Sequence, residues 1–157
     1  MKEKNEIKIV CTNHQAYRDF FVLESYEAGL MLVGCEVKSL RENEVSLAGS
    51  FAHFEKGELF LYNLYVAPYI KGNRENEVPL RPRKLLLHRN QLLKIAAQSQ
   101  EKGLALVPLK LYFNDHGVAK IELGVGRGKK FHDKRFDIKK SDVKRDIDRA
   151  IKNRNRK

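Results

Sequence analysis

The sequence has 157 residues and a formal net charge of +11, with 31 Lys and Arg against 20 Asp and Glu. An apolar content of 42% is enough for the core of one domain, which excludes a wholly disordered chain, and no run approaches the roughly 18 apolar residues of a membrane span. A charge balance this basic predicts a polyanionic partner, usually nucleic acid or an anionic membrane.

Short runs with strand-like patterns follow one another along most of the chain. The clearest is residues 118–125, where Ala119, Ile121, Leu123 and Val125 share one face and Lys120 lies on the other. A Lys-Gly pair within residues 55–58 predicts a β-hairpin between two such runs. We expect a break or a close backbone approach at Gly29, inside a run that resumes at residue 30. The predicted strands are residues 6–11, 20–27 with 30–33, 50–54, 59–66, 104–113 and 118–125.

Three short helices are predicted between these strands. The side chain of Thr12 or Asn13 can cap a first helix that ends near Asp19. The second covers residues 34–43, where one face points to the core and Lys38 and Arg41 share another, either as a solvated face or as two cations for phosphates. The third ends at Gly103. Residues 67–83 are predicted to be a long exposed loop. About six strands and these helices predict a small, mainly β barrel with short α-helices.

The charge is concentrated at the C-terminal end. Residues 127–157 hold fourteen Lys and Arg and five acids, a net charge of +9. The glycine-rich GVGRGKK stretch does not have the spacing of a Walker A loop, so it is either a flexible exit from the barrel or a backbone that approaches an RNA phosphate. A thin stripe of Val143, Ile147 and Ile151 follows, with a possible cap at Ser141 or Asp142. We expect this tail to be disordered when free and helical against a polyanion.

No catalytic or metal-binding pattern is present. The five histidines are scattered, and no Cys and His spacing matches a metal site, so we expect neither a metal nor a cofactor. Cys11 and Cys35 are predicted to be free thiols in a reducing compartment, and the charged first ten residues do not have the pattern of a signal peptide. The carboxylates are spread singly, which argues against a ribonuclease or RNA-modifying enzyme.

Five segments in this order resemble the SsrA-binding protein family, also called small protein B: EAGLMLVGCEVKSLR, RKLLLH, LVPLKLY, AKIELGVGRGKK and HDKR. The resemblance covers nearly the whole chain from Asn13. It implies an oligonucleotide-binding-like β-barrel over residues 1–130 and a basic C-terminal tail over residues 131–157. It also implies a cytoplasmic protein without catalytic activity that acts as a monomer with its RNA.

The function implied by the resemblance is trans-translation. Members bind the tRNA-like domain of transfer-messenger RNA (tmRNA) and help to deliver it to stalled ribosomes, where the tail enters the decoding centre and the empty message channel of the small subunit. The incomplete product is then tagged for proteolysis. Elongation factor Tu is implied as a partner through the shared RNA. A ribosomal or ribosome-assembly protein with a basic extension is the alternative that composition alone also fits.

The family's functional positions can be carried over one by one. The implied RNA contacts on the barrel and at the root of the tail are Asn13, Glu27, Lys38, Arg41, Arg83, Leu86, His88, Lys120, Gly128, Lys129 and Lys130. Some members have Asn at the position of His88. The implied decoding-centre contacts are His132, Asp133, Lys134 and Arg135. The cations expected on the tail helix are Lys140, Lys144, Arg145 and Arg149.

Overall fold

The computed structural model describes residues 6–71 and 76–155, and for residues 131 and 132 it describes the backbone alone. Four helices lie within this part of the chain: α1 (His14–Asp19), α2 (Gly34–Arg41), α3 (Arg89–Ser99) and α4 (Phe131–Arg154). The longer strands are β1 (Lys8–Thr12), β2 (Phe20–Leu30), β4 (Phe51–Glu55), β5 (Glu58–Tyr62), β7 (Arg83–Leu86), β8 (Leu104–Phe113) and β9 (Ala119–Gly128). Two short strands, β3 (Val45–Ser46) and β6 (Tyr65–Val66), pair with each other.

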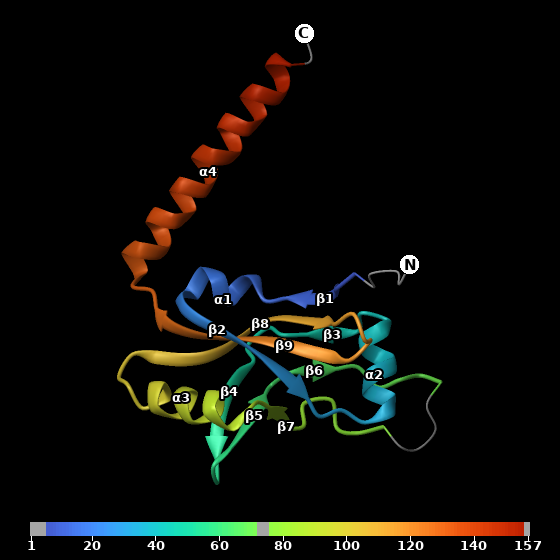
Figure 1. Cartoon of the computed structure of the whole chain (residues 1–157). Helices are drawn as coiled ribbons and strands as arrows, with labels where there is room; N and C mark the ends of the chain where they lie inside the picture. Colours follow the sequence, from blue (N-terminus) through green and yellow to red (C-terminus); the bar gives the residue numbers. More distant parts are fainter. Residues whose placement is uncertain (1–5, 72–75, 156–157) are drawn as a thin grey trace.

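The longer strands form one sheet that closes on itself (Figure 1). Their order is β1-β8-β4-β5-β7-β2-β9, and an additional pairing of β8 with β9 completes the ring. β8 pairs with β9 along its whole length, whereas it pairs with β4 only through Leu106 and Ala52. Closure satisfies the backbone groups that an open sheet leaves at its edges. The prediction of a mainly β, oligonucleotide-binding-like barrel with short helices is confirmed.

Side-chain alternation fills the inside of the ring. Ile121, Leu123 and Val125 of β9 are buried as predicted, and Lys120 lies on the other face, partly exposed. Helices α2 and α3 add Leu40 and Ile95 to the same core, and both side chains are fully buried. Burial of a Leu or Ile side chain is worth about 1.5–3 kcal/mol, so these two contacts fix the helices to the barrel.

The helix α1 covers a second, smaller cluster, in which Ala16 packs against Val107 and Leu109. Two glycines of β9 make room for this packing. A Cβ atom at Gly124 would lie 2.9 Å from Cδ1 of Leu109, and one at Gly126 would lie 3.0 Å from Cβ of Phe20. Both glycines lie within β9, and close packing explains why these positions have no side chain. The interpretation of GVGRGKK as a flexible exit is therefore wrong for Gly124 and Gly126.

The predicted boundaries are right in some places and wrong in others. Asn13 caps α1 by accepting a hydrogen bond from the amide of Ala16, and the hairpin turns at Lys56 and Gly57, which both have positive φ. β2 is continuous to Leu30, and its irregularity lies between Val22 and Glu24 rather than at Gly29. The expected close approach at Gly29 is present, because a Cβ atom there would lie 3.3 Å from Cβ of Leu86.

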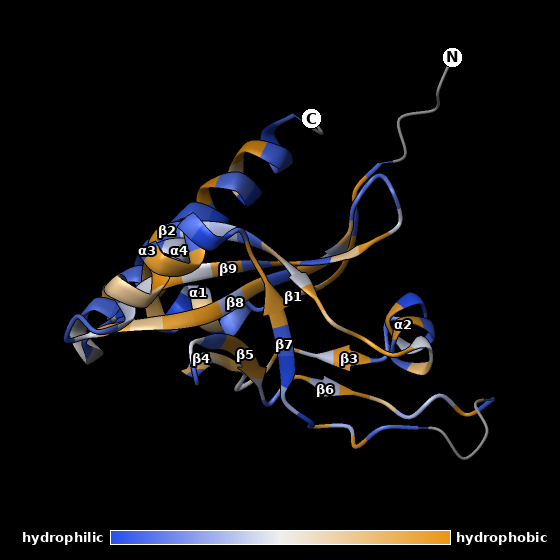
Figure 2. Ribbon diagram, turned by 60° about the horizontal axis from the view of Figure 1, so that its bottom comes forward, coloured by the Kyte–Doolittle hydropathy of each residue, from blue (hydrophilic) through white to orange (hydrophobic). Residues whose placement is uncertain are grey.

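The basic tail is a long helix that projects from one side of the barrel (Figure 1). It begins at Phe131, so Ser141 and Asp142 lie inside the helix and do not cap it. The cap is formed by Asp133, whose carboxylate accepts a hydrogen bond from the amide of Lys130. Figure 2 shows apolar bands between hydrophilic ones along this helix. The disorder expected of the free tail is not tested by this structure and stays a prediction.

Candidate nucleic-acid interface

Four of the residues expected to contact RNA meet at one cavity of about 390 Å³, which Glu27, Leu86, His88, Lys120, Leu87 and Gln91 line. Glu27 comes from β2, Leu86 from the end of β7, and Lys120 from β9, while His88 directly precedes α3 at its N-cap position. The strand register brings them together, because Gly29 of β2 pairs with Leu86 on one side and with Lys120 on the other.

The cavity offers several kinds of contact at once. Leu86 is 46% exposed and gives it an apolar wall, and Lys120 adds a cation. Within the described residues neither Lys120 nor His88 makes a side-chain hydrogen bond or ion pair, so both polar ends are available to a ligand. An ammonium group, an imidazole and an apolar side chain suit a phosphate, a base edge and a ribose or base face, respectively.

Glu27 is held by a residue that the sequence analysis missed. The hydroxyl of Tyr112 on β8 donates a hydrogen bond to the Glu27 carboxylate. Burial and this hydrogen bond raise the pKa of Tyr112, so the phenol remains a donor. One carboxylate oxygen of Glu27 thus has a fixed partner, and the group can still accept from a base or ribose. Tyr112 lies opposite Lys120 in the β8–β9 register, and no local pattern in the sequence gives this pairing.

The cations of α2 lie apart from this cavity. The ammonium of Lys38 is 5.3 Å from the ring centroid of Tyr69, and the guanidinium of Arg41 is 6.0 Å from that of Phe113. Arg41 and Lys38 are both exposed. Cation–π contacts at such sites are weak, so both side chains can turn toward a phosphate.

Arg83 does not take the position that its expected role requires. Its side chain is fully buried and donates five hydrogen bonds, two of them to the Glu36 carboxylate and the others to the carbonyls of Leu64, Arg81 and Pro79. Burial raises the pKa of Glu36, but hydrogen bonds from Arg81 and Arg83 outweigh it and leave the pKa lowered, so the pair is ionised. In this structure the guanidinium of Arg83 joins α2 to the loop before β7 and has no exposed group for a phosphate. The expected RNA contact of Arg83 stays a prediction.

Asn13 is also buried, with 6% of its surface exposed. Its side-chain oxygen caps α1, and its amide donates a hydrogen bond of 2.9 Å to the carbonyl of Pro108 on β8. In this structure Asn13 fixes α1 against the barrel, and its side chain is buried away from solvent. The expected RNA contact of Asn13 stays a prediction.

The root of the tail follows the end of β9. Gly128 pairs with Phe20, and Lys130 is exposed at the cap of α4. The ammonium of Lys129 lies 2.5 Å from the Asp137 carboxylate and 4.9 Å from the ring centroid of Phe21. Of the predicted RNA contacts at this root, Gly128 and Lys130 are thus open to a ligand, whereas Lys129 already has partners in the chain.

The expected decoding-centre contacts lie in the first turns of α4. Asp133 contributes to the helix cap, Lys134 forms an ion pair with Asp19, and Arg135 is exposed. The side chain of His132 lies outside the described part. The cations further along the helix are all exposed: Lys140, Lys144, Arg145 and Arg149. These exposed side chains give α4 a cationic surface along its length.

The described residues offer neither a metal site nor a membrane span. No group of three or more His, Cys, Asp or Glu side chains there is arranged to hold a metal ion. No helix in the same ranges is both long enough and apolar enough to span a bilayer.

Comparison with known proteins identifies relatives of this chain. Residues 10–153 match the family model described as SmpB protein. The chain is 53% identical to the SsrA-binding protein of Bacillus pumilus over 96% of both sequences. It is 51% identical to that of Geobacillus kaustophilus over 96% of this chain and 97% of the relative.

A solved structure agrees with these relatives. A chain described under "tmRNA-SmpB: a journey to the center of the bacterial ribosome" superposes with a TM-score of 0.66 and is 55% identical. The match covers 77% of this chain and 85% of that one. Because the family model covers nearly the whole sequence and a solved related chain superposes on 77% of it, the chain belongs to the SmpB protein family.

Proposed function

We propose that this protein binds the tRNA-like domain of tmRNA and takes part in trans-translation on stalled ribosomes. The observation that carries the proposal is the meeting of Glu27, Leu86, His88 and Lys120 at one cavity on the barrel. The relatives named SsrA-binding protein, and the related chain from a tmRNA–SmpB structure, support the choice of this RNA.

In the proposed complex the barrel reads the shape of a folded RNA. Lys120 contacts a phosphate, Leu86 packs on a ribose or base, and His88 and Glu27 exchange hydrogen bonds with base or ribose groups. Lys38 and Arg41 on α2, together with Gly128 and Lys130 at the root of the tail, extend the contact along the RNA backbone. Phosphate contacts position a protein without reading sequence, so we expect affinity to fall steeply with salt.

The tail has a separate part in this proposal. Residues 131–157 act in the decoding centre and the empty message channel of the small subunit, with His132, Asp133, Lys134 and Arg135 nearest the decoding site. Exposed cations along α4 support contact with ribosomal RNA. Exposed apolar residues on this helix bury too little surface to hold its distal part in place, so we expect residues 140–153 to exchange their amide protons rapidly in the free protein.

The partners in this proposal are tmRNA, the ribosome and, through the shared RNA, elongation factor Tu. The protein contributes binding and no catalytic step. Delivery to the ribosome is followed by tagging of the incomplete product, so RNA binding and tagging can be measured separately.

Two forms of the protein test this proposal, the full chain and one that ends at Lys130. Both are expected to bind the tRNA-like domain with similar affinity, and only the full chain is expected to support tagging in a reconstituted translation reaction. Lack of RNA binding by the full chain would overturn the proposal, as would tagging by the shortened form.

A further inference from the structure

An aromatic side chain lies open to solvent at the end of the sheet from which the chain leaves the barrel. Phe21 of β2 is 44% exposed, and no other ring of the described residues stacks on it. In the strand register Phe21 pairs with Arg127 of β9, which pairs with Leu104 of β8 on its other side. Directly opposite side chains lie on the same face of a sheet, so these three residues form a row across three strands.

This row lies on the opposite face of the sheet from the cavity around Glu27. Side chains alternate along β9, so Arg127 has the orientation of Val125, which is buried in the core. Glu27 pairs with Glu122, which has the other orientation. The irregularity in β2 shifts the alternation of that strand by one residue, which explains the change of face. Phe21 therefore lies where the core side of the sheet is no longer covered.

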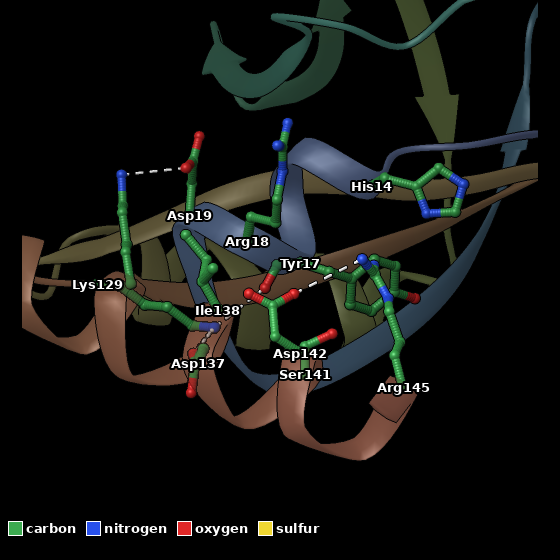
Figure 3. A pocket seen from close by; sticks show the side chains of 11 residues that line it. His14, Tyr17, Arg18, Asp19, Lys129, Asp137, Ile138, Ser141, Asp142 and Arg145 are labelled. Atoms are coloured by element: carbon green, nitrogen blue, oxygen red, sulfur yellow. Dashed lines mark hydrogen bonds and ion pairs between the residues drawn. The ribbon is translucent and has the colours of Figure 1, made fainter. Parts of the chain in front are cut away.

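Two cations flank the ring of Phe21. The ammonium of Lys129 lies 4.9 Å from the ring centroid and donates a hydrogen bond of 3.2 Å to the carbonyl of Tyr17. Lys129 and Tyr17 both line the cavity shown in Figure 3. Arg127 is exposed and makes no hydrogen bond or ion pair within the described residues. We call Phe21, Arg127 and Lys129 the Phe21 patch; none of these contacts involves residues 131–157, so the patch does not require a folded tail.

The composition of the Phe21 patch suits an unpaired RNA base with its neighbouring phosphates. A base can stack on an exposed aromatic ring, and cations beside the ring neutralise the phosphates. A single exposed phenylalanine is common on protein surfaces, so the ring alone would indicate nothing. Phe51 of β4 shows the difference. It is also 44% exposed, but it stacks on Tyr62 with 5.5 Å between ring centroids, and within the described residues no cation lies over it.

The position of the patch along β9 indicates which RNA it contacts. Gly128 and Lys130, which the proposed function assigns to tmRNA, follow Arg127 closely in the chain. β9 has 10 residues and is about 33 Å long at roughly 3.3 Å per residue. An RNA that contacts Lys120 near the start of this strand and Lys130 beyond its end therefore reaches the patch. The bases of a folded RNA that side chains can stack on are those of loops, bulges and ends.

We propose that the Phe21 patch is a stacking site for one unpaired base of the tRNA-like domain. Phe21 provides the surface on which the base stacks, and Arg127 and Lys129 contact the phosphates beside it. Together with the cavity around Glu27, the patch gives the RNA one attachment point near each end of β9, which fixes the direction in which the RNA lies along the barrel. The inference rests on the proposed function in that tmRNA is the ligand.

A tryptophan in place of Phe21 tests the stacking directly, because the chain contains no other tryptophan. Phe21→Trp keeps an aromatic ring, so it should bind the tRNA-like RNA, and its fluorescence should fall on binding because a stacked base quenches indole emission. Phe51→Trp is the matched control, since the exposed fraction of Phe51 is the same, and its fluorescence should not change. Unchanged fluorescence of Phe21→Trp in the RNA complex would overturn the inference.

The affinity for the tRNA-like RNA, measured at several salt concentrations, separates stacking from charge. Phe21→Ala should weaken binding at least about fivefold, the lower end of the effect expected for loss of one stacked base, and should leave the salt slope unchanged. Phe51→Ala should leave the affinity unchanged. Arg127→Gln should reduce the salt slope of log K by about 1. Equal losses in the two alanine variants would show a general effect of lost apolar surface and overturn the inference.

Two further outcomes are distinguishable from these. If small ribosomal subunits quench Phe21→Trp and the bound tRNA-like RNA does not, Phe21 contacts ribosomal RNA, and the inference is overturned. If the unsubstituted chain does not bind the tRNA-like RNA, the proposed function and this inference are both overturned. Failure of the inference alone leaves that binding intact.

Discussion

Substitution of Arg83 should destabilise the barrel and leave RNA binding by the folded protein unchanged. Its guanidinium is fully buried, shares the Glu36 carboxylate with Arg81, and donates to the carbonyls of Leu64 and Pro79. Loss of one partner of a buried ion pair costs about 3–5 kcal/mol. Because Glu36 keeps Arg81 as a partner, we expect Arg83→Ala to cost about 3 kcal/mol, a large part of the roughly 5–15 kcal/mol of a typical domain.

Urea unfolding followed by circular dichroism measures this loss, and RNA affinity is then compared per folded molecule. Arg83→Lys keeps the charge but not the forked geometry of the guanidinium. Its free energy of unfolding should therefore lie between those of the unsubstituted protein and of Arg83→Ala. Lys84→Ala is the control, because its ion pair with Glu58 is 34% and 51% exposed and should contribute less than about 1 kcal/mol. Unchanged stability with weaker RNA binding in Arg83→Ala would refute the structural role.

Three further outcomes are expected. Hydrogen bonds, the strongest of them from Tyr26, lower the pKa of Glu24 from 4.5 to about 2. Their contribution to stability is therefore complete above about pH 4.5 and is lost as the pH falls toward 2. Glu24→Gln should make the melting temperature depend less on pH across this window, and an unchanged pH dependence would contradict this expectation. Lys120→Ala should weaken binding of the tRNA-like RNA and reduce the salt slope of log K by about 1, whereas the remote, exposed Lys102→Ala should not. His132→Ala should leave RNA affinity nearly intact and impair tagging on ribosomes, and equal losses in both assays would refute this division.

Local patterns were enough to predict much of the barrel. The alternation in residues 118–125 predicts the buried face of β9, the Lys-Gly pair predicts the hairpin turn, and a cap at Thr12 or Asn13 predicts the start of α1, which Asn13 caps. Each of these features depends on residues within a few positions of one another. The resemblance to a known family supplied Glu27, Leu86, His88 and Lys120, which no local pattern singles out.

Long-range contacts account for the features that local patterns do not predict. The burial of Arg83 depends on Glu36, which is 47 positions away in the chain. The contact of Tyr112 with Glu27 depends on the pairing of β9 with both β8 and β2. The four-residue strand β7, just after a long loop, has no pattern of its own, and it forms because β5 and β2 lie on either side. Without this pairing the sequence does not show which side chains of β7 are buried and which are exposed.

Closure of the ring by its last strand has a consequence for synthesis of the protein. β9 joins β2 near the start of the chain to β8, and Phe20 pairs with Gly128. A polypeptide released before residue 119 would lack β9 and leave β2 and β8 with open edges, which invite aggregation. Interrupted translation of this message would therefore yield fragments with an unclosed barrel, and such fragments are the kind of incomplete product that the proposed pathway removes.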